Sequence, residues 1–349
     1  MSNKPLLITM GDPAGIGPEI VTLSLAQLHG QEDLHSVVVG DVGVMRHAAA
    51  RLAQQGLAKV KVLELSSLDA LESMAPNQAH EGVVMPVLQV MPALPPITLG
   101  QVSATAGQAS ATAVEWAAQA VLQGRARGLA TAPIHKQAWH AAGLTFPGHT
   151  EMLQALSAQH LGCSLDALPV RMMLATPRLR VVLVTIHLAL REAIAALSPE
   201  LVLQTLRIAH KDLAVQLQRP PRLVVAGLNP HAGEGGQMGD EEIRILGPAI
   251  QMAQKEGLQV SGPLPSDTVF LQALDSDRHP ERFDAVVVMY HDQGLIPIKL
   301  LGFDEGVNVT LGLPLRRTSP DHGTAFDLAG SGRARPDSMM AAIRLLGLF

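Results

Sequence analysis

The stretch that decides the fold is residues 285–291, AVVVMYH, in which an apolar run ends directly in His291. The same pattern occurs twice earlier, as VVLVTIH at residues 181–187 and as LVVAGLNPH at residues 223–231. Runs that are apolar at successive positions are typical of strands buried on both faces of a parallel sheet. Side chains that follow such strands gather beyond their carboxyl ends. We therefore predict an α/β fold with three histidines at one sheet edge.

These histidines form a candidate metal site, with His187, His231 and His291 as the ligands. Three protein ligands and one open position are the arrangement of a catalytic metal, whereas a structural site is closed by a fourth ligand. A single histidine after a strand is more often a loop residue, so the prediction depends on all three. Their surroundings favour a site, because polar or glycine-rich segments follow, NPHAGEGGQMGDEE around the second histidine and HDQG at the third.

The composition indicates a cytoplasmic enzyme. The chain has 349 residues, enough for about two domains, and a net charge of -5 with its 26 Lys and Arg residues dispersed. A nucleic-acid partner is therefore not expected. The one cysteine, Cys163, cannot form an intrachain disulfide, which suits a reducing compartment. No apolar run has the length of a signal-peptide core or a membrane span, so no membrane association is expected.

Strands and helices alternate along most of the chain, which favours a mostly parallel sheet. The expected strands are residues 5–10, 36–40, 60–65, 129–131, 171–175, 180–186, 222–228, 285–290 and 307–311. The expected helices are residues 16–27, 42–55, 104–123, 150–160, 199–217, 240–256 and 337–348. The alanine-rich helix 104–123 is expected to be buried and structural. The proline-rich segment 75–100 is interpreted as a linker that crosses between two domains.

The glycine-rich motif near the N-terminus, GDPAGIGPEI at residues 11–20, matches no phosphate-binding loop. An isoleucine replaces the third glycine of the dinucleotide-binding fingerprint, and the Gly-Lys-Ser/Thr of a P-loop is missing. The motif is therefore read as a tight turn with a proline in the first turn of the helix. Asp12 has either a role in a site or a role in this turn.

Several polar residues are candidates for binding an anion. Arginine matches the planar geometry of phosphate or carboxylate, and a helix N-terminus favours the same groups. Arg316 is interpreted as a residue of a solvated loop. Asp267 is either a turn residue or a base. The candidate anion donors are Lys299, Asn308 and Arg317, together with His149 and Thr150 at the start of a helix.

Eight motifs, in order along the chain, resemble the 4-hydroxythreonine-4-phosphate dehydrogenase family of vitamin B6 biosynthesis. They are GDPAGIGPE, TAPIHK, GHTEML, NPHAGEGGQMGDEE, LPSDT, MYHDQG, GVNVTLGLP and RRTSPDHGTA, between residues 11 and 325. The resemblance implies the isocitrate/isopropylmalate dehydrogenase-like α/β fold, with two α/β domains flanking a central cleft. The expected domains are about residues 1–125 with 300–349 on the cofactor side, and 126–299 for metal, substrate and dimerisation.

The same resemblance implies the site residues and the assembly. A divalent zinc, magnesium or cobalt ion would be held by the three histidines named above, in a homodimer with its active sites at the subunit interface. Asp267 and Lys136 are the candidate catalytic residues. The substrate-binding residues implied are His149, Thr150, Lys299, Asn308 and Arg317.

The segment 322–334, HGTAFDLAGSGRA, is similar to the loop that holds the adenosine end of the dinucleotide in isopropylmalate dehydrogenases. By that analogy Asp327 would face the ribose hydroxyls, which favours NAD over NADP. Phe326 and Arg335 depart from that loop, and the arginine would accommodate a 2′-phosphate, so NAD and NADP both stay open. The cofactor-binding residues implied are His322, Gly323, Thr324 and Asp327.

The implied reaction is the NAD(P)-dependent oxidation of 4-phosphooxy-L-threonine to 2-amino-3-oxo-4-phosphooxybutanoate. This product decarboxylates to 3-amino-2-oxopropyl phosphate on the route to pyridoxine 5′-phosphate. A paralogous dehydrogenase of a phosphorylated threonate or of a cis-dihydrodiol carboxylate is the nearest alternative. A phosphate acyltransferase and a non-catalytic metal-binding protein are the alternatives from other classes.

Overall fold

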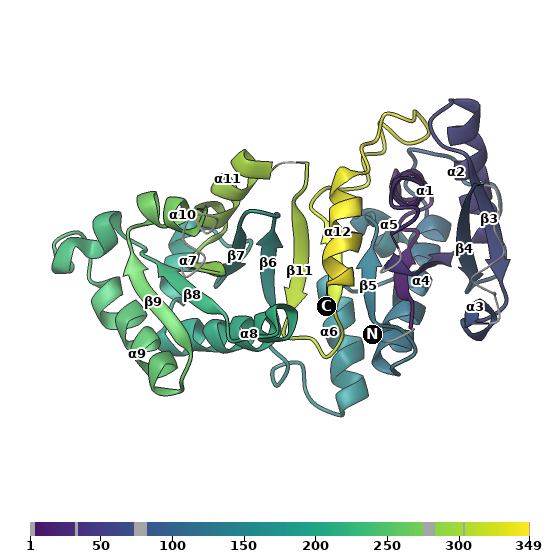
Figure 1. Cartoon of the computed structure of the whole chain (residues 1–349). Coiled ribbons are helices and arrows are strands. Elements are labelled where there is room, and N and C mark those ends of the chain that lie inside the picture. Colours follow the sequence, from purple (N-terminus) through teal and green to yellow (C-terminus); the bar gives the residue numbers. More distant parts are fainter. Residues whose placement is uncertain (1–3, 32–33, 73–81, 275–282, 303, 349) are drawn as a thin grey trace. The chain divides into compact units, whose positions relative to one another are not determined.

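The computed structural model describes residues 4–31, 34–72, 82–274, 283–302 and 304–348, which fall into two compact units (Figure 1). Unit 1 comprises Met1–Leu168 and Leu313–Phe349, and unit 2 comprises Pro169–Gly312. These boundaries differ from the expected ones at 125/126 and 299/300. The reason is local packing, because the helices that follow residue 125 pack against an alanine-rich helix of unit 1.

Unit 1 is built on a sheet of parallel strands. Their spatial order is β3 (Val60–Leu65), β4 (Val83–Gln89), β2 (Ser36–Gly40), β1 (Leu6–Thr9), β5 (Gly128–Thr131) and β12 (Arg317–Pro320). The central strand β1 is buried at every position. A strand covered on both faces is mostly apolar, as the first three residues of β1, LLI, show.

The helices of unit 1 cover this sheet (Figure 1). They are α1 (Gly17–Gln27), α2 (Val42–Gln54), α3 (Asp69–Glu72), α4 (Ala104–Leu122), α5 (Lys136–Ala141), α6 (His149–Leu161) and α12 (Asp337–Gly347). The helix α4 is buried, as expected, and packs against α5, α6 and three strands. Its small side chains allow this close approach.

The interpretation of residues 75–100 as a linker between domains is wrong for the described part, residues 82–100. This part lies within unit 1, and it contains β4, which pairs in parallel with both β3 and β2. Its prolines misled the prediction, since Pro86 sits inside β4 itself. Residues 75–81 lie outside the described residues.

Unit 2 contains a mixed sheet. The strand order is β11 (Val307–Leu311), β6 (Arg171–Ala175), β7 (Arg180–Leu183), β10 (Ala285–Val288), β8 (Arg222–Ala226) and β9 (Gln259–Leu264). The strand β6 runs antiparallel to both of its neighbours, whereas β7, β10, β8 and β9 are parallel. The carboxyl ends of β7, β10 and β8 therefore lie side by side.

The connections of unit 2 are helices and one unusual loop. They are α7 (Leu190–Ala196), α8 (Pro199–Leu217), the loop η2 (Pro230–Gly236), the π-helical turn η3 (Glu242–Leu246), α9 (Gly247–Lys255), α10 (Ser266–Leu274) and α11 (His291–Gly302). The single helix expected over residues 240–256 is thus a π-helical turn followed by α9. In the described ranges, no helix is both long and apolar enough to cross a membrane.

The contact between α4 and α5 gives a test of this packing. A Cβ atom on Gly107 would lie 2.0 Å from the backbone oxygen of Ala138. We expect Gly107→Ala to lower the free energy of unfolding by about 1–3 kcal/mol, the cost of overpacking a core. Urea unfolding followed by tryptophan fluorescence measures this. Gln108→Ala, at an exposed position of the same helix, is the control, and equal midpoints for the two variants would contradict the prediction.

Candidate functional site

Two of the three predicted metal ligands lie together in unit 2. His187 follows β7 and His291 follows β10, and the centroids of their rings are 5.6 Å apart. The ends of these strands are tied by Thr185, whose Oγ1 donates a hydrogen bond of 2.7 Å to the backbone oxygen of Met289. Parallel pairing thus delivers both imidazoles to one sheet edge, as the apolar runs predict.

His291 has the carboxylate partner that is common for a histidine metal ligand. Its Nδ1 lies 2.8 Å from Oδ1 of Asp292. An imidazole that donates its Nδ1–H to a carboxylate keeps the Nε2 lone pair for a metal. The arrangement suits a ligand at the surface, because both side chains reach solvent.

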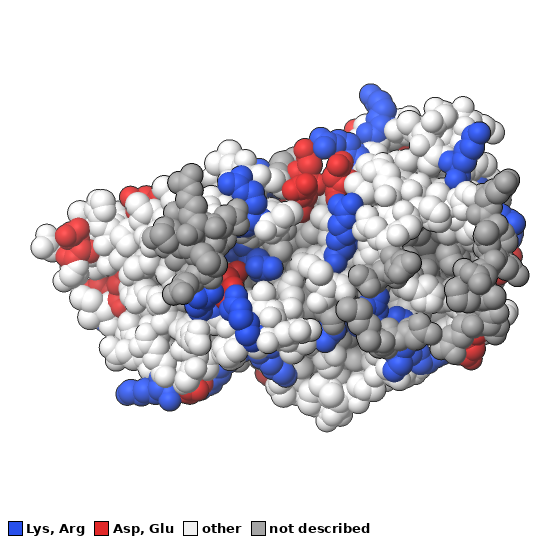
Figure 2. All heavy atoms as spheres, viewed as in Figure 1, with Lys and Arg blue, Asp and Glu red and all other residues white. Residues whose placement is uncertain are grey.

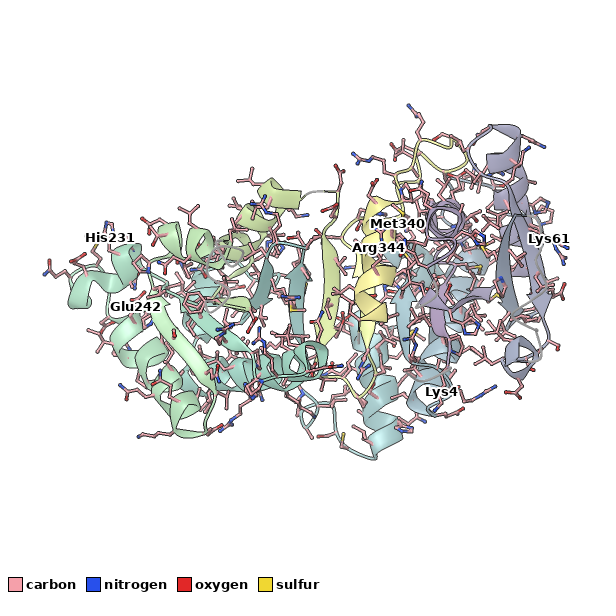
Figure 3. The ribbon with its side chains drawn as sticks, viewed as in Figure 1. Lys4, Lys61, His231, Glu242, Met340 and Arg344 are labelled. Carbon is pink, nitrogen blue, oxygen red and sulfur yellow. The ribbon has the colours of Figure 1, made fainter. Side chains whose placement is uncertain are left out.

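The third histidine does not join this pair within one chain. His231 lies in the exposed loop η2, at the outer end of unit 2 (Figure 3). Among the described residues no group of three His, Cys, Asp or Glu side chains is placed to hold a metal ion. The trio stays a prediction.

The backbone is strained where two of these histidines sit. His187 has a φ of 44°, and φ is 52° at His231, 53° at Ala232 and 43° at Glu234. Residues with a Cβ avoid this left-handed region, at a cost of roughly 1–2 kcal/mol each. Such strain tends to persist where a site requires it. The positions of His187 and His231 are therefore better explained by a site than by a simple connection.

Glu242, in η3, braces the loop that carries His231 (Figure 3). Its Oε1 accepts hydrogen bonds of 2.7 Å from the backbone amides of Leu228 and Asn229, and its Oε2 accepts one of 2.9 Å from the side chain of Asn229. Glu242 is buried. A buried carboxylate that caps two backbone amides fixes where the chain leaves β8.

Gln293 joins three connections at the same edge. Its amide nitrogen donates to the backbone oxygen of Gly227 at 2.6 Å and to Oγ of Ser266 at 2.9 Å, and its oxygen accepts from the backbone amide of Met289 at 2.6 Å. Asp267 lies in the exposed first turn of α10. It directly follows Ser266, which bonds to the chain at the end of β8.

A buried cationic cluster lies in unit 1. Arg317 is buried, and its Nε and Nη2 donate to Oγ1 of Thr131 at 3.0 and 2.8 Å. Burial lowers the pKa of Arg317 to about 10, although Glu151 acts in the opposite direction. The guanidinium is therefore charged at neutral pH. A buried guanidinium can donate charge-assisted hydrogen bonds to an anionic ligand.

His149 faces this cation at the first turn of α6. Its Nε2 is buried and has no hydrogen-bond partner in the described ranges. Its ring packs edge-on against Trp139, with the ring centroids 5.7 Å apart. Burial, and then the charge of Arg317, lower the pKa of His149 well below its ordinary value of 6.5. A neutral imidazole with an unused nitrogen can donate to or accept from a ligand oxygen.

One more predicted substrate residue and one catalytic candidate lie at the same helix end. Thr150 follows His149 in α6, and Cε of Lys136, the catalytic candidate, is 3.8 Å from where a Cβ of Gly148 would stand. A helix N-terminus beside lysine, histidine and arginine is a site for phosphate or carboxylate. Lys299 and Asn308 lie in unit 2, on α11 and β11.

Arg316 lies in the loop directly before β12, as expected, but it is half-buried and not fully solvated. Its backbone oxygen accepts a hydrogen bond of 2.9 Å from the amide of Leu129 in β5, which holds this end of the loop against the sheet.

The 322–334 loop docks on the glycine-rich motif at residues 11–19. The backbone oxygen of Thr324 accepts from the amide of Ile16 at 3.0 Å, and a Cβ on Gly15 would stand 3.0 Å from the same residue. Glycine is therefore required for close approach, a signal that a fingerprint search cannot give. Of the predicted cofactor residues, Thr324 is buried, whereas His322, Gly323 and Asp327 are exposed.

Two further residues of this region were given no role by sequence reasoning or only an uncertain one. Phe326 stacks on His135 with ring centroids 4.5 Å apart. Asp12 is buried, with its Oδ1 accepting from the amide of Ala14 at 2.8 Å, so it has at least the turn role. Burial raises the pKa of Asp12.

Sequence reasoning also missed the roles of Thr131, Glu242 and Gln293, since these roles depend on partners distant in sequence.

Charged side chains are dispersed on the face of the molecule that Figure 2 shows. On that face, the described Lys and Arg side chains are scattered among uncharged residues and beside Asp and Glu.

Comparisons with known proteins give consistent matches. The sequence profile of the family described as pyridoxal phosphate biosynthetic protein PdxA matches residues 32–346. A 4-hydroxythreonine-4-phosphate dehydrogenase of Beijerinckia indica subsp. indica is 46% identical over 343 residues, which cover 98% of this chain and 94% of that protein. A D-threonate 4-phosphate dehydrogenase of Salmonella typhimurium is 42% identical over 345 residues, covering 99% and 98%. A solved 4-hydroxythreonine-4-phosphate dehydrogenase of Klebsiella pneumoniae has a TM-score of 0.82 at 38% identity, covering 99% and 98%.

The enclosed His149 predicts a pH dependence of stability. Its pKa is lower in the folded chain than the ordinary 6.5, so below that pH the unfolded chain binds a proton that the folded chain does not. The free energy of unfolding therefore falls as the pH drops below 6.5, by up to about 1.4 kcal/mol per pH unit.

Urea unfolding from about pH 5 to 8 measures this slope. We expect His149→Gln to lose less stability than the wild type on the acid side. His160→Gln, at an exposed position of the same helix, is the control and should follow the wild type. Parallel curves for the wild type and His149→Gln would contradict the prediction.

Proposed function

Because this chain belongs to the PdxA family of pyridoxal phosphate biosynthetic proteins, we propose that it oxidises 4-hydroxythreonine 4-phosphate with a nicotinamide dinucleotide as hydride acceptor. Its relatives are named as dehydrogenases, so the chain is an oxidoreductase. A phosphate acyltransferase does not agree with those names. The isocitrate/isopropylmalate dehydrogenase-like fold is part of this proposal, and the two α/β units support it.

The observation that carries the proposal is the cluster of Arg317 and His149 in unit 1. Arg317 is a buried cation that donates to Oγ1 of Thr131, and Nε2 of His149 beside it has no hydrogen-bond partner in the described ranges. A phosphorylated substrate supplies the oxygens that these groups need. Charge-assisted hydrogen bonds from arginine and from a helix N-terminus hold phosphate strongly. Thr150 and Lys136 would add donors at the same place.

The strand-end histidines would hold the divalent metal, whether zinc, magnesium or cobalt. His187 and His291 supply two neutral nitrogen ligands, and Asp292 supports one of them. When bound, such an ion acts as a Lewis acid that lowers the pKa of a coordinated hydroxyl group. Since His231 stands apart in one chain, we propose that a second copy supplies it in a homodimer.

Exposed apolar side chains support this dimer. Unit 2 exposes such residues after each predicted ligand. Groups of exposed apolar side chains are rare on a surface that faces only water. They include Leu188 and Leu190 after His187, Met238 and Ile243 after His231, and Ile296 and Leu300 after His291.

The remaining roles are assigned to residues of this chain. Asp267 would accept the proton of the substrate hydroxyl, and Lys136 is the second candidate. Lys299 and Asn308 would contact the substrate from unit 2. The 322–334 loop would bind the dinucleotide, with Asp327 on the ribose, and both NAD and NADP stay in the proposal. The oxidised product, 2-amino-3-oxo-4-phosphooxybutanoate, would then lose carbon dioxide to give 3-amino-2-oxopropyl phosphate.

A second substrate has a specific observation in its favour, namely the 42% identity to a D-threonate 4-phosphate dehydrogenase. Both substrates have a phosphate at one end, so the cluster of Arg317 and His149 would serve either. They differ in the amine or hydroxyl next to the carboxylate.

Turnover decides between these substrates. We expect reduction of the dinucleotide with 4-hydroxythreonine 4-phosphate, little with D-threonate 4-phosphate, and loss of turnover in chelator. Arg317→Met should raise the KM for the phosphorylated substrate by about tenfold or more, since a charge-assisted hydrogen bond is lost. Faster turnover of D-threonate 4-phosphate would replace the first proposal by the second.

Mixing two inactive variants tests the shared metal site. His187→Ala and His231→Ala should each lose metal binding, measured by calorimetry with Zn²⁺. If the two histidines of one site come from different copies, refolding the variants together regenerates about one site in four. Sites made from one chain would regenerate none. His160→Ala, with an exposed histidine removed, is the control for non-specific binding.

A further inference from the structure

Glu19 is a buried carboxylate that none of the proposed roles uses. It lies in the first turn of α1, its side chain is 2% exposed, and its oxygens make no hydrogen bond within the described ranges. The nearest cation is Arg51 of α2, with Nη1 3.6 Å from Oε1. Burial raises the pKa of Glu19, and Arg51 opposes this shift. A buried acid with so few partners calls for an explanation.

Glu19 lies against Arg51, and the guanidinium of Arg51 reaches the 322–334 loop. The backbone amides of Gly330 and Gly332 make no hydrogen bond to the carboxylate, but they are close enough to oppose the rise in the pKa of Glu19 that burial causes. Arg51 approaches the same turn, because its Nη1 is 3.3 Å from where a Cβ of Gly330 would stand. Gln55, at the end of α2, donates to the backbone oxygen of Gly330 at 3.2 Å. Side chains from two helices thus surround one turn of the loop.

The turn itself needs such support. Gly330 and Gly332 have φ values of 80° and 70°. Glycine adopts positive φ about as readily as negative φ, so the residues themselves do not fix this conformation. A cavity of about 310 Å³ is lined by Glu19, Arg51 and Leu99 among others, and the last two also lie close to Gly330. A loop of flexible glycines next to empty space has room to move unless a fixed group holds it.

We propose that Glu19, held by Arg51, positions the 322–334 loop for dinucleotide binding. The carboxylate is fixed by two helices and attracts the amides of the loop, so that Asp327 and its neighbours keep one arrangement before the dinucleotide arrives. Preorganisation of this kind raises affinity without a direct contact. Glu19 is thus a positioning residue. This inference rests on the proposed role of the loop.

The test compares dinucleotide affinity with substrate affinity. Glu19→Gln keeps the size of the side chain and removes its charge. We expect the Kd of NADH, read from its fluorescence, and the KM of the dinucleotide to rise by about tenfold. The kcat and the KM of the phosphorylated substrate should stay within about twofold of wild type. Arg51→Met should have the same effect, and Arg51→Lys should retain most of the affinity.

Arg46→Met is the matched control. Arg46 lies on the same helix, α2, and its ion pair with Glu64 is exposed, so its loss should leave both affinities unchanged. An unaltered Kd of NADH in Glu19→Gln would overturn the inference. So would a parallel loss of substrate affinity and of the unfolding midpoint, which indicates a general structural role.

The binding measurement separates this inference from the proposed function. A protein that binds NADH but oxidises neither phosphorylated substrate would refute the proposed reaction, and the Kd comparison would still decide the role of Glu19. A wild-type protein that binds neither NADH nor NADPH would overturn both.

Discussion

Parallel pairing of β10 between β7 and β8 is the constraint on which the site in unit 2 depends. Because the three strands run the same way, their carboxyl ends lie at one edge of the sheet. The connections that leave these strands therefore begin close to one another. Backbone groups at such an edge have no further strand to pair with. Gln293 and Glu242 satisfy several of them, and in doing so fix where each chain segment turns away. The histidines are presented by connections that these two side chains hold in place.

The two units offer different chemistry. Unit 1 presents a buried guanidinium, an enclosed neutral imidazole and a helix N-terminus, which together suit oxygen atoms with negative charge. Unit 2 presents imidazoles with a supporting carboxylate, which suit a divalent cation. Phosphate binding needs the first kind of partner, and metal binding needs the second. A single fold of alternating strands and helices supplies them because every parallel strand ends in a new connection.

Much of the fold could be predicted from the sequence, because apolar runs and helical stops act locally. The strands before His187, His231 and His291 are found with ends shifted by a few residues. The strand β4 was missed because its proline and the prolines around it suggested a linker, and β12 because RTSP is polar. The roles of Thr131, Gln293 and Glu19 were out of reach, since each depends on a residue far along the chain. The separation of His231 from the other two histidines has the same cause: periodicity gives strand ends but not the path of a glycine-rich loop.

The left-handed backbone of η2 sets stability against the proposed metal role of His231. Glycine at position 231 would relieve the conformational cost that a Cβ atom brings at a φ of 52°, but it would also remove the imidazole. Selection for heat resistance alone would favour that exchange, whereas selection for the proposed metal site would oppose it. Under that proposal, evolution towards a more stable chain and evolution towards an active one diverge at this loop.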